Sequence, residues 1–195
     1  MAHVLHQNNG SVQFTDDITS VGAPKQPASG HVAVKHEQFG PICKTTLTLD
    51  NVAQAVTNGT EYQSTQIYDF PAGRILVLGV TATLLQKTTS TLAITINSGS
   101  TGAISLGTAA ASNVSLTSTM VDLLPSTAFT SSTTINVAGT AVSAALAASA
   151  QFDGTATAKD MYLNTAYATT TDVDGNGTQT ISGTVVFTWI NLGDY

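Results

Sequence analysis

The residues whose type and spacing come nearest to a chemical site are in the segment Asp172-Val173-Asp174-Gly175-Asn176-Gly177. Oxygen ligands at positions 1, 3 and 5, followed by glycine, form the first half of a calcium loop. The second half does not match, because Gly183 stands at position 12, where calcium loops have a bidentate glutamate. Asp, Asn and Gly are also the usual residues of hairpin turns. We therefore interpret residues 172–177 as a turn between strands, with calcium binding as the alternative.

The histidines and the single cysteine are the next candidates for metal binding or catalysis. His3, His6, His31 and His36 all lie in the first 40 residues, without the HExxH spacing of a zinc site. On a strand, residues 31 and 36 would also face opposite sides. We interpret the four as exposed, with pH-sensitive docking of this segment as an alternative, because imidazole titrates near neutral pH. Cys43 has no intrachain disulfide partner, and we interpret it as a small buried apolar residue rather than a nucleophile.

No other pattern of residues predicts catalysis. The 12 acidic residues are scattered, whereas glycoside cleavage needs two carboxylates at a defined separation. The sequence alone leaves open whether two of them meet in space. No GxSxG, GxxxxGK[ST] or GxGxxG motif occurs with the flanking elements it needs. We therefore predict no catalytic residue, no metal ligand, no cofactor and a protein that is not an enzyme.

The composition is typical of a sheet protein with a neutral polar surface. Only 9% of the residues are charged, against about a quarter in an average domain. Thr, Ser, Ala and Gly take their place, and β-branched threonine favours the pleated surface of a strand. The composition predicts an all-β protein.

Charge and hydropathy exclude two classes of partner. The net charge is -6, and nucleic-acid binding needs clustered basic residues. The basic residues are instead scattered singly, as Lys25, Lys35, Lys44, Arg74, Lys87 and Lys159. The longest apolar run, Ile75 to Val80, is too short to span a bilayer, and the first residues lack the pattern of a signal peptide. We expect a soluble protein made in a cytoplasm, binding neither nucleic acid nor membrane.

Two regions differ in their patterning. Residues 1–40 contain many Gly and Pro residues and little alternation, which is typical of an extended arm or loops. A disordered tail is the alternative, and an arm that orders against a neighbouring chain would reconcile the two. Residues 41–195 are long enough for one sizeable core, and we predict that they form a single jelly-roll or β-sandwich domain.

Alternation of apolar and polar residues locates the strands of that domain. Strands are predicted near residues 45–49, 62–70, 74–83, 91–97, 104–106, 120–124, 133–137, 155–168 and 180–190. The run Ile75 to Val80 is apolar on both faces, which indicates a central strand buried on both sides. Residues 141–150 are the one candidate helix, with a loop or strand as alternatives.

The last strand is predicted to be integral to the core. Ile181, Val185, Phe187 and Trp189 share one face of it. Burying four such side chains stabilises a fold by about 6–12 kcal/mol before opposing terms, which is comparable to the net stability of a whole domain. Removing this strand should therefore unfold the domain.

Three stretches of the chain resemble a known class of protein. They are Tyr68–Ile75 (YDFPAGRI), Phe152–Asn164 (FDGTATAKDMYLN) and Gly183–Tyr195 (GTVVFTWINLGDY). Together they resemble virion structural proteins of tailed bacteriophages, in particular the small β-sandwich or jelly-roll cement proteins that decorate capsids. The stretches cover less than half of the chain and include no mechanistic motif.

The resemblance implies a structural role in the virion. Such a protein would bind the outer surface of the capsid and stabilise it, as a homotrimer bridging subunits of the major capsid protein, after synthesis in the host cytoplasm. The extended arm would add a strand to a neighbouring sheet or wrap adjacent capsomers, and many copies would bind with avidity. One alternative is a phage tail or receptor-binding domain with a carbohydrate-binding face. A bacterial surface adhesin is another alternative.

Overall fold

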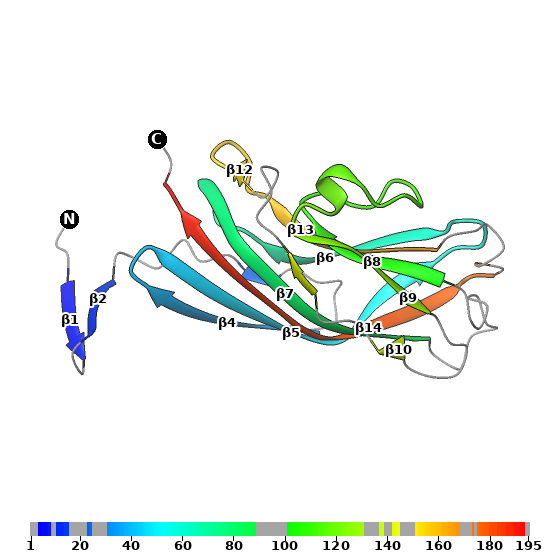
Figure 1. Ribbon diagram of the computed structural model, residues 1–195, viewed down its shortest axis with the longest axis horizontal. Helices are drawn as coiled ribbons and strands as arrows, with labels where there is room; N and C mark the ends of the chain where they lie inside the picture. Colours follow the sequence, from blue (N-terminus) through cyan, green and yellow to red (C-terminus); the bar gives the residue numbers. More distant parts are fainter. Residues whose placement is uncertain are drawn as a thin grey trace.

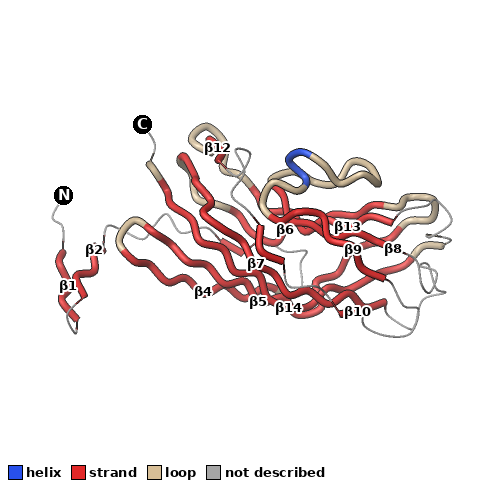
Figure 2. The backbone as a smooth tube through the Cα atoms, in the orientation of Figure 1, coloured by secondary structure: helices blue, strands red, loops and turns tan. Residues whose placement is uncertain are grey.

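The structure is a computed structural model that describes residues 4–8, 11–15, 23–24, 31–88, 101–130, 137–138, 142–144, 151–167, 173 and 175–193. The described elements are β-strands and one short 3₁₀ helix (Figures 1 and 2). In chain order they are β1 (Val4–Asn8), β2 (Ser11–Thr15), β3 (Ala23–Pro24), β4 (Val32–Phe39), β5 (Ile42–Val56), β6 (Tyr62–Asp69), β7 (Arg74–Thr88), β8 (Thr101–Gly107), η2 (Ser118–Met120), β9 (Leu124–Thr130), β10 (Val137–Ala138), β11 (Val142–Ala144), β12 (Gln151–Asp153), β13 (Asp160–Tyr167) and β14 (Gly177–Asn191). The predicted all-β class is confirmed.

The strands from β5 onward pair in a nested way, the first with the last. β5 pairs with β14, β6 with β13, β7 with the short strands β10 to β12, and β8 with β9, all antiparallel. A long hairpin of this kind, rolled so that successive pairs alternate between two sheets, is a jelly roll. The rolling also brings β14 beside β7 and β13 beside β8. The predicted jelly-roll or sandwich architecture is therefore the observed one.

The rolled hairpin gives two sheets that lie face to face (Figure 1). The larger sheet has the order β10-β7-β14-β5-β4, with β11 and β12 also paired to β7. The smaller sheet has the order β3-β6-β13-β8-β9. Strands β1 and β2 form a separate two-stranded sheet, which stands clear of the sandwich in Figure 1.

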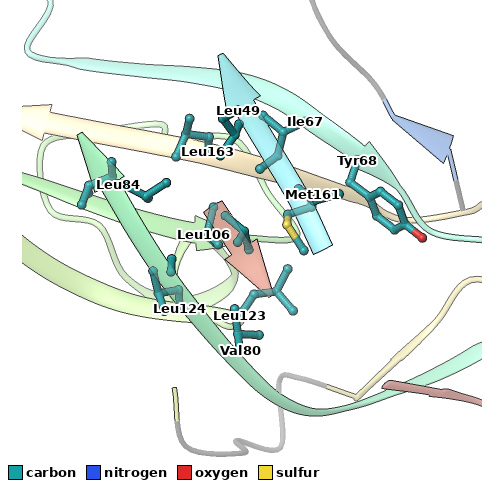
Figure 3. Close-up of a cluster of buried hydrophobic side chains, with 14 of the residues drawn as sticks. Leu49, Ile67, Tyr68, Val80, Leu84, Leu106, Leu123, Leu124, Met161 and Leu163 are labelled. Carbon is teal, nitrogen blue, oxygen red and sulfur yellow. The ribbon is translucent and has the colours of Figure 1, made fainter. Parts of the chain in front are cut away.

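Apolar side chains from both sheets fill the space between them. Figure 3 shows part of this core, including Leu49, Ile67, Leu106, Met161 and Leu163. Towards the end of the sandwich where β14 finishes, Phe70 packs edge to face against Tyr68, Phe187 and Trp189, with ring centroids 5.1–6.1 Å apart. Edge-to-face contacts at this separation are favourable for aromatic rings.

Strand β14 contributes the inward face that its alternation predicts. Ile181, Val185, Phe187 and Trp189 are each at most 1% exposed. The strand lies between β5 and β7 in the larger sheet, so its backbone is hydrogen-bonded on both sides. The prediction that this strand is integral to the core is confirmed.

The opposite end of the sandwich is held by buried polar side chains. Gln179 of β14 donates from Nε2 to Oε1 of Gln54 (2.9 Å) and to Oγ1 of Thr165 (2.8 Å). Tyr167 donates its hydroxyl to Oε1 of Gln179 at 2.6 Å, and Gln54 donates to the carbonyl of Leu163 at 2.8 Å. These bonds join the larger sheet to β13 of the smaller one. Buried polar groups that find partners in this way help to specify a single packing of the core.

The outer face of the smaller sheet is covered by the segment 108–123, which lies over it in Figure 1. Asn164 of β13 is fully buried and donates from Nδ2 to the carbonyls of Ala109 and Met120, each at 3.0 Å. Leu116 and Met120 form a small second apolar cluster on this face. The smaller sheet is thus protected on both faces.

Residues 31–40 belong to the sandwich rather than to an arm. β4 pairs with β5 from Val32 opposite Leu49 to Phe39 opposite Ile42, and Val32 is buried in the core. The predicted arm boundary at residue 40 therefore moves to the N-terminal side of β4. The reason is local: the Gly-Pro pair that suggests a linker at residues 40–41 forms the tight turn between β4 and β5.

Two predicted strands have different bounds in the structure. In the predicted strand 120–124, Met120 ends η2, and β9 begins only at Leu124. In the predicted strand 155–168, the strand begins at Asp160. The preceding bend is stabilised by Asp153, which accepts hydrogen bonds from the backbone and hydroxyl of Thr155 at 3.0 and 2.6 Å. Such local side-chain bonds compete with strand pairing.

The remaining predictions fall mainly on residues outside the described ones. In the candidate helix 141–150, residues 142–144 form strand β11, which was one of the alternatives, and the others are not described. The predicted strand 91–97 lies outside the described residues. In the strand predicted at 133–137, residues 133–136 also lie outside the described residues, and Val137 is the first residue of β10.

Candidate docking surface

A row of apolar residues crosses the outer face of the larger sheet, near the turn between β4 and β5. The register places Phe39 opposite Ile42, Ile42 opposite Ile190, and Ile190 opposite Leu76. Directly opposed residues of antiparallel strands lie on the same face. Trp189 points into the core and is 1% exposed. Because successive side chains of a strand point to opposite faces, Ile190 points outward, and the residues paired with it in the row point outward too.

Strand β7 adds a further apolar residue beside this row. Trp189 pairs with Val77 but Thr188 pairs with Gly79, which leaves Leu78 as the extra residue of a β-bulge. Leu78 is 37% exposed. A Cβ atom at Gly79 would meet nothing within 4 Å, so the space above the sheet is open here. The prediction that this strand is buried on both sides is wrong, because each strand of a two-layer sandwich has only one face against the other sheet.

We call this region the outer apolar surface, and it comprises Phe39, Ile42, Leu76, Leu78, Ile190 and Leu192. Phe39 is 65% exposed and Leu192 is 46% exposed. The segment 108–123 protects the smaller sheet, whereas no described segment covers this part of the larger sheet. An exposed apolar surface on a sheet face is a candidate site of contact with another molecule.

A hollow of about 430 Å³ adjoins the outer apolar surface between β7, β12 and the chain after β14. Its walls combine the polar side chain of Gln151 with apolar residues, which are Ile75, Leu76, Phe152 and Leu192. Arg74 and Asp153 stand at its rim with Nε and Oδ2 3.8 Å apart, and both side chains are more than half exposed. Solvent screens an exposed pair at this distance, so it contributes little to stability.

Asn191 positions the chain that carries Leu192. Its Nδ2 donates to the carbonyl of Ala72 at 3.1 Å, while the backbone N–H of Leu192 donates to the carbonyl of Arg74 at 2.8 Å. Gly73 has φ of +124°, and a Cβ there would lie 2.5 Å from Oδ1 of Asn191. Glycine is therefore required at residue 73 for both its backbone conformation and the close approach of the amide. Residues 72–74 and 191–193 thus meet at this surface.

Charged side chains border the outer apolar surface on its β4 side. Glu37 lies between Lys35 and Lys44, with N–O distances of 3.1 and 3.5 Å. The hydrogen bond from Lys35 and the positive charges of both lysines lower the pKa of the Glu37 carboxyl. β4 is the edge strand of its sheet, and charges on an edge strand discourage the addition of a further strand. Glu37 and Lys44 alternate with the inward residues as Phe39 and Ile42 do, so these charges lie on the same outer face of the sheet.

The described residues of the calcium-like segment, Val173 and residues 175–177, lie beside the turn between β5 and β6, where the backbone N–H of Gly59 donates to the carbonyl of Val173 at 3.3 Å. Asp172 and Asp174 lie outside the described residues, while Val173 is buried. Asn176 accepts a hydrogen bond from the backbone N–H of Asn58 at 2.9 Å, which ties the segment to the turn between β5 and β6. Among the described side chains, no group of three or more His, Cys, Asp or Glu residues is placed to hold a metal ion.

Cys43 lies in β5, and His36 lies in β4. Cys43 is buried, and burial raises the pKa of its thiol, which makes it a poor nucleophile. His36 is half-buried in β4, with Nδ1 2.8 Å from Oγ1 of Thr45, so the prediction of an exposed arm histidine is wrong for this residue. His31 is half-buried beside β4. His3 and the side chain of His6 lie outside the described part of the chain.

Sequence reasoning missed the outer apolar surface, although one signal for it was present. The run Ile75 to Val80 is apolar at both odd and even positions. A strand of a two-layer sandwich buries only one of those sets, so such a run requires an apolar outer face. Ile42 and Ile190 lie opposite each other only because β5 pairs with β14. No local sequence pattern reveals that pairing.

Comparisons with known proteins assign no family to this architecture. No protein-family model matches the chain, and no curated protein has significant sequence similarity to it. Within the described ranges, no helix has the length and apolar character needed to cross a bilayer.

Proposed function

We propose that this chain is a structural virion protein that binds the outer surface of a bacteriophage capsid and stabilises it. In this proposal it acts as a cement or decoration protein, located on the capsid exterior as a homotrimer that bridges subunits of the major capsid protein. The observation that carries the proposal is the outer apolar surface, which includes Phe39 and Leu192. Contact with another protein chain would bury these exposed apolar side chains.

The chemistry of the described side chains favours assembly over catalysis. The buried polar groups at the Gln179 end bond to one another. The hollow beside Leu76 has mainly apolar walls and one exposed ion pair at its rim. A jelly roll offers a rigid support for such a surface, and repeated weak contacts on a symmetric shell add up to firm attachment.

The alternative, a tail or receptor-binding domain that recognises carbohydrate, has less support. Trp189, the one tryptophan, is 1% exposed in the core. Phe39 is the one aromatic residue among the strongly exposed large apolar side chains of the described part. A sugar-binding face would present several aromatic rings flanked by polar groups, whereas the residue paired with Phe39 is Ile42.

The proposal is tested on purified phage particles that encode the chain. Quantitative mass spectrometry should find it in a fixed ratio to the major capsid protein, with as many copies as a shell-wide lattice of sites requires. Particles assembled without the chain should lose their genome at lower temperature, and adding the purified chain should restore their heat resistance. Its absence from particles, or a copy number that fits only a tail, would overturn the proposal.

A further inference from the structure

Two Asn-Gly dipeptides lie beside each other at the end of the sandwich where β14 begins. Asn58-Gly59 forms the tip of the turn between β5 and β6, and Asn176-Gly177 leads into β14. The backbone N–H of Asn58 donates to Oδ1 of Asn176 at 2.9 Å. Asparagine deamidates most readily before glycine, because glycine has no Cβ to hinder attack by its backbone nitrogen on the side-chain amide. Both dipeptides therefore have the chemistry for this modification.

Asn58 has the freedom that the reaction requires. Its turn is closed by a hydrogen bond from the N–H of Thr60 to the carbonyl of Thr57 at 2.9 Å, and Gly59 has φ of +73°, as at the third residue of a type II turn. Asn58 and Gly59 are both exposed. Within the described part of the chain, Asn58 forms a hydrogen bond through its backbone but none through its side-chain amide. The side chain is therefore free to turn towards the nitrogen of Gly59.

The nitrogen that would attack is itself only weakly held. The N–H of Gly59 donates to the carbonyl of Val173 at 3.3 Å, which is longer than a typical backbone hydrogen bond. Rotation of the Asn58–Gly59 peptide at the tip of the turn costs this bond and leaves the paired strands β5 and β6 in place.

Asn176 is restrained on both sides of the bond that would react. Its Oδ1 accepts the hydrogen bond from the backbone of Asn58, which holds the side chain away from its own backbone. Gly177 is half-buried and is the first residue of β14, where it pairs with Val56 of β5. Rotation of the Asn176–Gly177 peptide would therefore break a side-chain hydrogen bond and disturb the strand. The two sites differ in structure although both have the local sequence Asn-Gly-Thr.

We propose that Asn58 is a site of spontaneous deamidation in the folded protein and that Asn176 is protected. The backbone nitrogen of Gly59 attacks Cγ of Asn58, its proton passes through solvent to the side-chain nitrogen, and that nitrogen leaves as ammonia. One water molecule then opens the resulting succinimide at either carbonyl, which leaves aspartate or isoaspartate at residue 58. Water is the only co-reactant, so the inference is independent of the proposed capsid role.

The modification would weaken a contact between the two turns. Isoaspartate carries the main chain through Cβ, which adds one backbone atom between residues 58 and 59. The bond that closes the turn at Thr57 and the bond from Gly59 to Val173 cannot then both keep their geometry. The chain that leads into β14 would lose part of its attachment to the turn between β5 and β6.

Mass spectrometry of the purified full-length chain, incubated at mildly alkaline pH, tests the proposal. Tryptic peptides 45–74 and 160–195 carry the two sites separately, and fragment ions locate the converted residue. In the native protein, Asn58 should convert at least about fivefold faster than Asn176, as expected when hydrogen bonds restrain one site. In the urea-unfolded chain the two should convert at similar rates. Equal native rates, or faster conversion of Asn176, would overturn the proposal.

Two substitutions at residue 58 test how Asn176 is protected. Asn58→Gln keeps the backbone N–H that binds Asn176, whereas Asn58→Pro removes it and suits the second position of a type II turn. Both should keep the melting temperature of the parent chain. Conversion of Asn176 should stay at the parent rate in Asn58→Gln and rise at least about twofold in Asn58→Pro. The same rate of Asn176 conversion in both variants would contradict protection by this hydrogen bond.

Discussion

Trp189 donates a hydrogen bond from its indole nitrogen to the hydroxyl oxygen of Thr45 at 2.9 Å, inside the sandwich. Both residues are at most 1% exposed. The same hydroxyl is 2.8 Å from Nδ1 of His36, so one threonine links three adjacent strands, β4, β5 and β14. Thr45 satisfies a donor that burial would otherwise leave without a partner.

Replacing Thr45 by valine should therefore destabilise the protein although the shape is kept. The substitution leaves the buried Trp189 N–H without its acceptor, which costs about 1–3 kcal/mol in the free energy of unfolding. Thr46→Val is the matched control, because Thr46 is half-buried at the adjacent position of β5, on the outer face. Urea unfolding followed by tryptophan fluorescence measures both. Equal free energies for the two variants would contradict this role of Thr45.

The arrangement around Trp189 shows what alternation predicts and what it does not. The four large apolar residues of β14 repeat with period two, and a strand with this pattern must bury that face. The opposite face includes Ile190, whose neighbours Ile42 and Leu76 lie far away in sequence and meet it only through the jelly-roll pairing. The core strand was therefore predictable, and the candidate docking surface was not.

Local turn chemistry explains the other differences between sequence and structure. Gly40 and Pro41 suggest the end of an arm, but Gly40 has φ of +61° at the tight turn between paired strands. Thr155 and its neighbours look like the start of a strand, but the side chain of Asp153 holds them in a bend. In both places the deciding interaction is a pairing or a hydrogen bond that composition does not specify.

Replacing Asn164 by aspartate should lower the free energy of unfolding, although the two side chains have nearly the same shape. Asn164→Asp replaces the Nδ2 donor by an oxygen that faces the carbonyls of Ala109 and Met120. We expect a loss of at least about 2 kcal/mol in the free energy of unfolding, because a buried charge is placed against two acceptors. Earlier protease cleavage within residues 108–123 should accompany it. Asn113→Asp is the control, since Asn113 is exposed and its Oδ1 acceptor is retained.

Truncations should distinguish the hairpin segment from the sandwich. Deleting residues 1–16 should leave the melting temperature of the jelly roll nearly unchanged, because β1 and β2 join neither sheet. Deleting residues 1–40 also removes β4 and with it the buried Val32, whose side chain alone stabilises the fold by about 1.5–3 kcal/mol. Calorimetry of both proteins measures the difference. A deletion of residues 1–40 that melts like the full chain would contradict the placement of β4 in the sheet.

Calcium should leave the stability of the protein unchanged. Asn176 already serves the turn by accepting from the backbone of Asn58, and Gly183 stands where a calcium loop needs its bidentate glutamate. A ligand that binds only the native state raises the melting temperature, and the rise grows with the logarithm of the ligand concentration above the Kd. Thermal unfolding with excess Ca²⁺ and with a chelator should therefore coincide. A rise with Ca²⁺ that is absent with Mg²⁺ would restore the calcium interpretation of residues 172–177.

Asp122 should make a contribution to the free energy of unfolding that decreases as the pH rises. Burial raises the pKa of this carboxyl above 3.8. The hydrogen bonds from the hydroxyl and backbone N–H of Thr108 lower the pKa, but by less than burial raises it. A raised native pKa gives stability that is fully present below the unfolded pKa and is lost as the pH rises through the native value. Asp122→Asn keeps an acceptor for the Thr108 N–H, and its amide can donate to the Thr108 hydroxyl.

The variant should therefore gain stability relative to the parent as the pH rises from about 3 to about 7. The comparison must be made between the two proteins, because Glu37 and Asp153 have lowered pKa values and act in the opposite direction in both. Urea unfolding across this pH range gives the difference directly. A difference that is constant with pH would show that the Asp122 carboxyl titrates alike in the folded and unfolded chains.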